Sequence, residues 1–276
     1  MDVSVLILTY NEEVNLERCF ASVAWCDDIV VLDSYSTDRT ESIARAAGVK
    51  FVQRTFDDYA SQRNFGLSKI DYKHAWILML DADEVVTPEL KEEIDRTVKT
   101  CDASMSLFRM RRIDHFMGRT IKRSSGYPTW FGRLARVGHV WVERAINEEY
   151  KTDGKIGFLQ NHLWHYPFNK GFQSWFEKHN RYSTMEARLK VEEQLTLFAF
   201  SDLWAGDPAV RRGAVKALAH KLPARPLIVF LGLYLVRGGF LEGRAGFVYS
   251  CLKSIYEFMI DCKVRELRRR KVDLPL

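Results

Sequence analysis

Short apolar runs alternate with amphipathic stretches through the first hundred residues. Val3–Leu8, Ile29–Leu32 and Trp76–Leu80 are apolar, and polar or acidic residues follow each of them. Apolar runs of this length predict strands that are buried on both faces, as in a parallel sheet covered by helices. Between the first two runs, apolar residues recur at helical spacing, at Leu16, Phe20 and Val23. The pattern therefore predicts the right-handed strand, helix, strand units of an α/β sheet.

Capping residues mark the expected helix boundaries. Asp38 with Glu41 three residues later predicts an N-cap and its reciprocal partner, and Gly48 predicts the end of that helix because glycine tolerates positive φ. Thr87 and Pro88 predict the N-cap and first position of another helix, of about ten residues.

The third apolar run ends directly in acidic residues. Asp81 and Asp83 follow Trp76–Leu80, and in an open α/β sheet the ligand crevice lies beyond the carboxyl ends of the strands. Two carboxylates one residue apart can hold a hard divalent cation, Mg²⁺ or Mn²⁺, which takes phosphate oxygens as further ligands. The alternative is that Asp81-Ala82-Asp83-Glu84 is a solvated turn that leads into a helix. These four residues alone do not decide between a metal site and a turn.

Composition narrows the class of protein. The chain has 276 residues, with 47% hydrophobic and 28% charged residues, which excludes a disordered chain. Its five cysteines are scattered and lack C-x-x-C spacing, which predicts reduced thiols in a cytosolic protein. Met1 leads straight into a strand-like run, so we expect no secretory signal.

Four motifs in order carry a resemblance. They are Thr9-Tyr10-Asn11-Glu12-Glu13, Val31-Leu32-Asp33-Ser34-Tyr35-Ser36-Thr37-Asp38, Gln62-Arg63-Asn64 and Leu80-Asp81-Ala82-Asp83-Glu84. Together the sequence resembles the family 2 glycosyltransferases of the GT-A fold, and among them the small bacterial enzymes of lipopolysaccharide core and exopolysaccharide synthesis. The fold expected from the resemblance is a mixed, mainly parallel α/β sheet flanked by helices, followed by a helical, membrane-associating C-terminal region.

The resemblance also implies roles for individual residues. The loop Thr9, Tyr10, Asn11, Glu12 and the acid Asp33 would contact the base and ribose of a nucleotide sugar, with UDP the expected nucleotide. Arg63 and Arg133 would line the donor site, Arg63 near the diphosphate. Asp81 would reach the ribose side and Asp83 would ligate the metal. A cation and an arginine there would offset the negative charge that develops on the leaving diphosphate.

Residues 101–205 are expected to form the acceptor half of the catalytic domain. An inverting transferase needs a carboxylate to take the proton of the attacking hydroxyl, and Glu148 is the candidate base. Relatives often carry Val-His-Glu here, whereas this chain has Asn147 before Glu148, and Glu149 leaves the register open by one residue. In the GT-A enzymes that the sequence resembles, a histidine from the next segment can complete the metal shell, and we favour His165 over His162 for this role.

The last third changes in composition. Pro226–Val236 is almost continuously apolar and Gly246–Ile260 is apolar-rich, and basic residues flank both. Pro226–Val236 is shorter than the roughly 20 apolar residues needed to cross a bilayer. Helices lying on an anionic membrane surface are one interpretation. A pair of helices that close the catalytic domain, or a dimer interface, is the other.

Together these observations predict a catalytic domain over residues 1–205, with a nucleotide-binding half over 1–100, and a basic helical region over 206–276. The expected protein is a metal-dependent, inverting glycosyltransferase at the cytoplasmic face of the inner membrane, peripheral or monotopic, acting on a glycolipid or lipid-linked acceptor. A nucleotidyltransferase would need a glycine-rich, basic first loop, which Thr9–Glu13 is not. A non-catalytic membrane scaffold is the other alternative. Nucleic acid is not expected as a partner, because the basic residues alternate with aliphatic runs.

Overall fold

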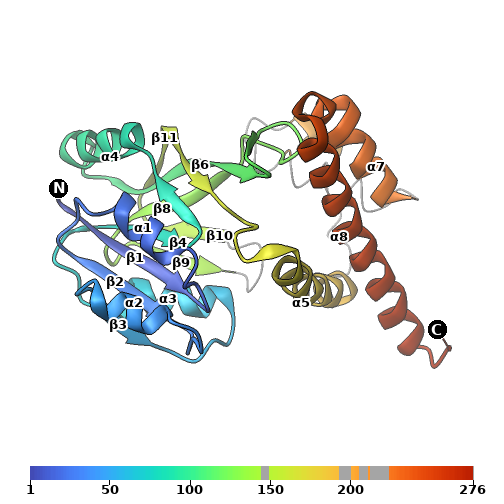
Figure 1. Cartoon of the computed structure of the whole chain (residues 1–276), viewed down its shortest axis with the longest axis horizontal. Coiled ribbons are helices and arrows are strands. Elements are labelled where there is room, and N and C mark those ends of the chain that lie inside the picture. The colour runs from blue at the N-terminus through green and yellow to red at the C-terminus, as the bar shows by residue number, and fades with distance from the viewer. Residues whose placement is uncertain (144–148, 193–199, 205–210, 212–223, 276) are drawn as a thin grey trace. The chain divides into compact units, whose positions relative to one another are not determined.

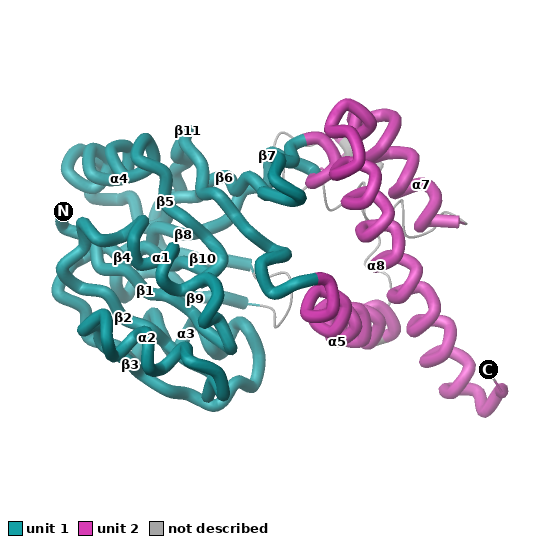
Figure 2. The backbone as a smooth tube through the Cα atoms, viewed as in Figure 1, with its two compact units in different colours: residues 1–122, 126–171 teal, residues 123–125, 172–276 magenta. Residues whose placement is uncertain are grey.

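The structure is a computed structural model that describes residues 1–143, 149–192, 200–204, 211 and 224–275 (Figure 1). The chain forms two compact units (Figure 2). The first contains residues 1–122 and 126–171, and the second contains residues 123–125 and 172–276. The division therefore comes earlier than the predicted boundary between residues 205 and 206. All five cysteines, which lie in described segments, are unpaired.

The first unit is built on a mixed sheet. Its strands are β1 (Val3–Thr9), β2 (Ile29–Asp33), β3 (Lys50–Gln53), β4 (Trp76–Asp81), β5 (Glu84–Val86), β6 (Met105–Phe116), β7 (Arg119–Ile121), β8 (Trp130–Arg136) and β11 (Lys155–His165). Among the described residues the order is β3-β2-β1-β4-β8-β6-β11-β5, with β7 on β6. β3, β2, β1 and β4 are parallel, as are β6 and β11, while β8 and β5 run antiparallel to their neighbours. This confirms the predicted α/β class.

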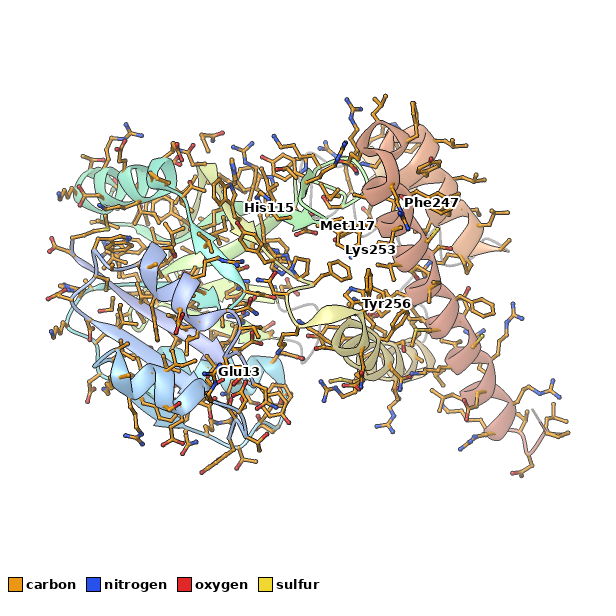
Figure 3. The ribbon with its side chains drawn as sticks, viewed as in Figure 1. Glu13, His115, Met117, Phe247, Lys253 and Tyr256 are labelled. Carbon is orange, nitrogen blue, oxygen red and sulfur yellow. The ribbon has the colours of Figure 1, made fainter. Side chains whose placement is uncertain are left out.

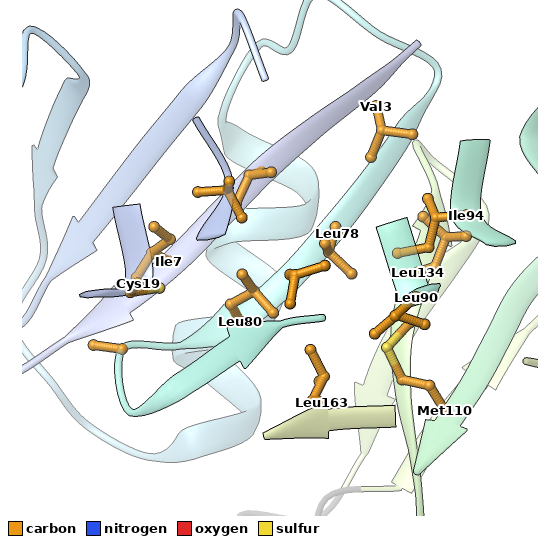
Figure 4. Packing of buried hydrophobic residues seen from close by; sticks show 14 of the residues in the cluster. Val3, Ile7, Cys19, Leu78, Leu80, Leu90, Ile94, Met110, Leu134 and Leu163 are labelled. Carbon is orange, nitrogen blue, oxygen red and sulfur yellow. The ribbon is translucent and has the colours of Figure 1, made fainter. Parts of the chain in front are cut away.

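Helices cover this sheet, and a short ribbon completes the unit. The helices are α1 (Leu16–Ser22), α2 (Thr40–Ala46), α3 (Tyr59–Lys69) and α4 (Pro88–Thr100), and the ribbon pairs β9 (Val140–Glu143) with β10 (Glu149–Thr152). Alternate residues of each central strand enter different clusters: Ile7 and Leu78 pack on one face (Figure 4), and Leu6 and Ile77 pack on the other. The central strands are thus buried on both faces, as the unbroken apolar runs predicted.

Helix boundaries partly follow the sequence signals. Thr87 accepts a hydrogen bond from the Leu90 backbone N–H at 3.2 Å and Pro88 opens α4, as predicted. The reciprocal cap predicted at Asp38 is wrong. The Asp38 carboxylate accepts from the backbone N–H groups of Thr40 and Glu13, so it joins two loops instead of capping a helix with Glu41.

The second unit is helical. It contains α5 (Gly171–Glu192), η1 (Phe200–Trp204), α7 (Arg225–Leu231), the π-helical turn η2 (Gly232–Val236), the 3₁₀ turn η3 (Gly239–Glu242) and α8 (Gly243–Arg270). α5 belongs here because it packs on α8, through Ala187 against Ile260 and Val264. Lys263 of α8 reinforces this packing by donating to the Asn180 carbonyl oxygen at 2.6 Å.

The hydropathy of the described helices gives one finding on membrane crossing. No single one of them is long and apolar enough to cross a bilayer, whereas Arg225–Val236 and Gly239–Arg270, bent by 70° at their junction, meet the length and composition test as a pair.

Candidate active site

The loops that follow β1 and β2 are joined by a set of polar contacts. Thr9 donates to the Asp33 carboxylate at 2.8 Å, and the backbone N–H of Ser36 donates to the same carboxylate at 2.8 Å. Asn11 adopts a left-handed conformation, with φ of 53°, and its side-chain oxygen accepts from the backbone N–H of Thr37 at 2.8 Å. The predicted nucleotide residues Thr9, Asn11 and Asp33 thus form one rigid rim at the carboxyl edge of the sheet.

Tyr10 and Glu12, the other two residues predicted in this rim, differ in environment. The Tyr10 side chain is 48% exposed and can offer its ring face to a ligand. Glu12 is tied at 2.6 Å to Lys170, which also donates to the backbone carbonyl oxygens of Tyr10 and Asn11. Burial and the charge of Asp83 raise the pKa of Glu12 despite this pairing. Lys170 therefore fixes the rim from the far end of the first unit's chain.

Asp81 lies between two buried guanidinium groups. Arg63 of α3 donates to one of its oxygens at 2.8 Å, and Arg133 of β8 donates to the other at 2.6 Å. The two arginine side chains are only 4% and 2% exposed. Burial would raise the pKa of Asp81, but Arg133, Arg63 and Arg112 outweigh it and hold the pKa well below its usual range. Arg63, Asp81 and Arg133, all predicted to line the donor site, thus lie together and form ion pairs with one another.

Glu84 completes this charged cluster and was not predicted as a site residue. Its fully buried carboxylate accepts from Arg133 at 2.8 Å, from Arg112 at 3.1 Å and from the backbone N–H of Asp81 at 3.0 Å. The Arg112 side chain is 22% exposed, more than those of the other two arginines. Arg112 and Asp114 are two residues apart on β6, so their side chains lie on the same face of the strand. Assigning this segment as a strand would have indicated from the sequence that the two residues belong together.

His165 stands between two carboxylates. Its Nδ1 is 2.7 Å from Asp114 of β6 and its Nε2 is 3.3 Å from Asp83. Strand pairing explains the arrangement, because β11 sets His165 beside Asp114 on one side and beside Glu84 of β5 on the other. Burial and Arg112 lower the pKa of His165, but Asp83 and Asp114 outweigh them and raise it. His162, the rival candidate, lies three residues earlier on β11.

The pair Asp83 and His165 fits a divalent cation in ligand type and spacing. Neighbouring ligands of an octahedral Mg²⁺ lie about 3 Å apart, close to the 3.3 Å between the Asp83 oxygen and His165 Nε2. The described residues contain no group of three or more His, Cys, Asp or Glu side chains placed to hold a metal. A cation here would therefore take its remaining ligands from water and from a bound diphosphate.

The candidate base Glu148 lies outside the described residues. Its neighbour Glu149 begins β10, where its carboxylate lies 2.5 Å from Lys151 Nζ and opposite Glu143 of β9. The structure therefore places the alternative base, Glu149, in an exposed ion pair.

Sequence comparison identifies the family. The sequence model of glycosyl transferase family 2 matches residues 4–167, which is more than half of the chain. The chain belongs to glycosyltransferase family 2. The match covers the rim, the charged cluster and the Asp83–His165 pair, and it confirms the family that the four motifs suggested. Membership removes the nucleotidyltransferase alternative.

Relatives are similar over almost their whole length. The lipopolysaccharide core biosynthesis glycosyltransferase LpsC of Rhizobium meliloti (strain 1021) is 26% identical over 273 residues, 96% of this chain and 92% of LpsC. An uncharacterised glycosyltransferase of Rickettsia prowazekii (strain Madrid E) is 24% identical over 287 residues, 96% of this chain and 87% of its own.

Solved structures give more distant matches. Residues 1–349 of TarS from S. aureus match with a TM-score of 0.45 and 14% identity, over 92% of this chain and 90% of that one. Glucosyl-3-phosphoglycerate synthase from Mycobacterium tuberculosis, solved with Mn²⁺, UDP and glucosyl-3-phosphoglycerate, matches with a TM-score of 0.35 and 21% identity, over 40% of this chain and 43% of that one.

Replacing Arg133 with Met tests the structural role of the charged cluster. The change leaves the buried carboxylate of Glu84 and one oxygen of Asp81 without their shortest partner, so we expect the free energy of unfolding to fall by about 3–5 kcal/mol. Denaturant unfolding measures it. Arg39→Met, which removes an ion pair whose arginine side chain is 78% exposed, is the matched control and should change stability by less than about 1 kcal/mol. Equal losses in the two variants would contradict a special role for the cluster.

Proposed function

We propose that this family 2 glycosyltransferase moves a sugar, with inversion, from a nucleotide donor to a hydroxyl of a membrane glycolipid or lipid-linked acceptor. UDP is the nucleotide to test first. The observation that carries the proposal is that Asp83 and His165 lie close together, near the rim that joins the ends of β1 and β2. All of these residues fall within the family match. The similarity to LpsC over 96% of the chain supports an acceptor in lipopolysaccharide core synthesis.

Donor binding divides among the residues of the first unit. The rim of Thr9, Asn11 and Asp33 would present backbone and side-chain groups to the base and ribose, with Tyr10 offering a ring face. Asp83 and His165 would hold Mg²⁺ or Mn²⁺, which offsets the charge that builds up on the leaving diphosphate. Because Arg63 and Arg133 are buried against acids, Arg112 is the better candidate for a direct phosphate contact.

Glu148 is the proposed base that takes the proton from the acceptor hydroxyl. The ion pair between Glu149 and Lys151 supports Glu148 over its neighbour, since an exposed paired carboxylate is a poorer base. We place the reaction at the cytoplasmic face of the inner membrane, where a nucleotide sugar and a lipid-linked acceptor meet.

Glu148→Gln should lower kcat by about 10²–10⁴-fold, because the amide cannot take a proton, while the KM for the donor changes little. Glu149→Gln is the matched control, with near wild-type kcat. Steady-state kinetics with a lipid-linked acceptor separates the two parameters. If Glu149→Gln is the variant that loses kcat, the register of the base is shifted by one residue.

Asp83→Ala tests the transferase itself. The full chain should be stabilised in thermal unfolding by one nucleoside diphosphate only when Mn²⁺ or Mg²⁺ is present, and a ligand at 100 times its Kd adds about 2.7 kcal/mol of apparent stability. Asp83→Ala should unfold at the wild-type temperature without ligand but lose both the metal-dependent shift and sugar transfer. Retained transfer would exclude the proposed metal ligand. A wild-type chain that responds to no nucleotide would favour a non-catalytic scaffold.

Asp114→Asn tests the support of His165. Asp114 fixes the ring through Nδ1, which leaves Nε2 directed at Asp83, and such outer carboxylates contribute about 10–100-fold to metal affinity. We expect a loss of that size in the Mn²⁺ concentration that gives half of the thermal shift at fixed UDP. Asp153→Asn removes an equivalent contact to His139, on the surface, and should leave this concentration unchanged. A similar loss in both variants would contradict the assignment.

A further inference from the structure

A helical hairpin in the second unit exposes many large apolar side chains. It consists of residues 225–247, which form α7, η2, η3 and the first turn of α8, and all of these residues are described; we call it the apolar hairpin. Eight of its aliphatic or aromatic side chains are at least 39% exposed: Leu227, Ile228, Leu231, Leu235, Val236, Phe240, Leu241 and Phe247. Val236, at 85%, is the most exposed of them. A concentration of exposed apolar side chains in one segment is typical of a binding surface.

The apolar hairpin is firmly packed, so these side chains do not belong to a frayed end. Arg225 at its start makes a buried ion pair of 2.6 Å with Glu257 of α8, and Ser254 of α8 donates to the Pro226 carbonyl oxygen at 2.7 Å. At its bend Gly246 approaches Gly239 so closely that a Cβ atom would lie 2.0 Å from the Gly239 carbonyl oxygen. Figure 1 shows α7 running beside α8. Within the hairpin, Tyr234 contacts the rings of Phe240 and Phe247. The hairpin therefore keeps its shape while its outer apolar side chains remain largely exposed.

The charge around the apolar hairpin has one sign. Glu242 is the only acid between residues 225 and 256. Its carboxylate accepts from the backbone N–H groups of Arg123 at 2.6 Å and Ser124 at 3.0 Å, so it faces inward. Arg237 and Arg244 are exposed, as is Arg123, whose guanidinium lies 3.4 Å from the Arg237 carbonyl oxygen. Among the described residues 225–256, the exposed charge is thus positive.

We propose that the apolar hairpin docks into the headgroup region of an anionic lipid bilayer. The hairpin exposes apolar side chains and arginines but no outward-facing acids. This combination matches the surface of an anionic bilayer, where negatively charged headgroups cover the hydrocarbon core. A nucleic acid would instead require stacking rings around a basic groove. The biological role of this docking rests on the proposed function, because docking would hold the enzyme at the surface where a glycolipid acceptor lies.

The depth of docking follows from the lengths of the elements. α7 and η2 together contain twelve residues, Arg225–Val236, fewer than the roughly 20 needed to cross the hydrocarbon core. The chain then bends by 70° into Gly239–Arg270, so no straight helix continues this run. The residues at the bend, from Leu235 to Leu241, would enter the boundary between headgroups and acyl chains, about 5–10 Å deep. Arg237 and Arg244 would then stand at the level of the phosphates. Phe247 and Lys253 follow along α8 (Figure 3), where the Lys253 ammonium lies over the ring of the buried Tyr249.

Vesicle flotation of the full chain tests the proposal without any sugar transfer. Wild type should float with vesicles of phosphatidylcholine and phosphatidylglycerol and much less with phosphatidylcholine alone. The triple variant Leu235→Ser, Val236→Ser, Leu241→Ser should lose at least about tenfold in partitioning, because three side chains no longer enter the apolar boundary. The matched control, Val137→Ser with Phe158→Ser, changes exposed apolar residues of the first unit and should float like wild type.

Charge reversal gives a second, independent measurement. Arg237→Glu with Arg244→Glu keeps the apolar side chains and should abolish the preference for anionic vesicles. The metal-dependent thermal shift with UDP should be the same in wild type, the triple variant and the charge-reversed variant. This result would show that the first unit is folded in each, and helical circular dichroism equal to that of wild type would show the same for the second unit. Together the two measurements separate failure of docking from failure of transfer. Wild type that does not float, or a triple variant that floats equally well, would overturn the proposal. So would a wild-type dimer that the triple variant converts to a monomer without vesicles present, because the surface would then be a protein interface.

Discussion

Two buried arginines that hold the acidic turn after β4 are the constraint on which the first unit depends. Arg63 comes from α3 and Arg133 from β8, and between them they neutralise Asp81 and Glu84 at the point where β4 ends and β5 begins. Leaving one of these buried charges without its partner lowers the stability of the fold by several kcal/mol. The arginines of α3 and β8 must therefore be in place for the acidic turn to be stable. The cluster defines where the turn can lie.

The candidate metal pair depends on this cluster. Asp83 sits between Asp81 and Glu84, and both sides of its turn are fixed: the Asp81 backbone N–H donates to Glu84 at 3.0 Å, and the Tyr166 backbone N–H donates to the Asp83 carbonyl oxygen at 2.9 Å. The second contact also anchors the strand that carries His165. The geometry of the candidate metal pair and the stability of the fold therefore depend on the same few hydrogen bonds. Rigid placement of this kind is what charge stabilisation in a transition state requires.

Much of the fold could be predicted from sequence because it is encoded locally. The apolar runs of β1, β2 and β4 and the cap at Thr87 need only short-range pattern, and the resemblance supplied Asp83 and His165. Asp114, Arg112 and Lys170 could not be found in this way, since they meet their partners through strand pairing and loop contacts across 28 to 160 residues. A sequence also does not show whether an arginine faces solvent or an acid. Arg63, expected near the diphosphate, and Arg133, expected to line the donor site, are each buried in an ion pair with an acid.

The position of β5 has a consequence for how the protein is made. β4 and β5 are separated by two residues in the chain, yet β4 lies in the middle of the sheet and β5 at its far end, where its partner is β11. During synthesis the acidic turn emerges about eighty residues before the strand that completes it. Until β11 has left the ribosome, Glu84 has no neighbouring strand and the site has no histidine. A nascent chain can thus build its parallel half early, but sugar-transfer chemistry must wait for the end of the first unit.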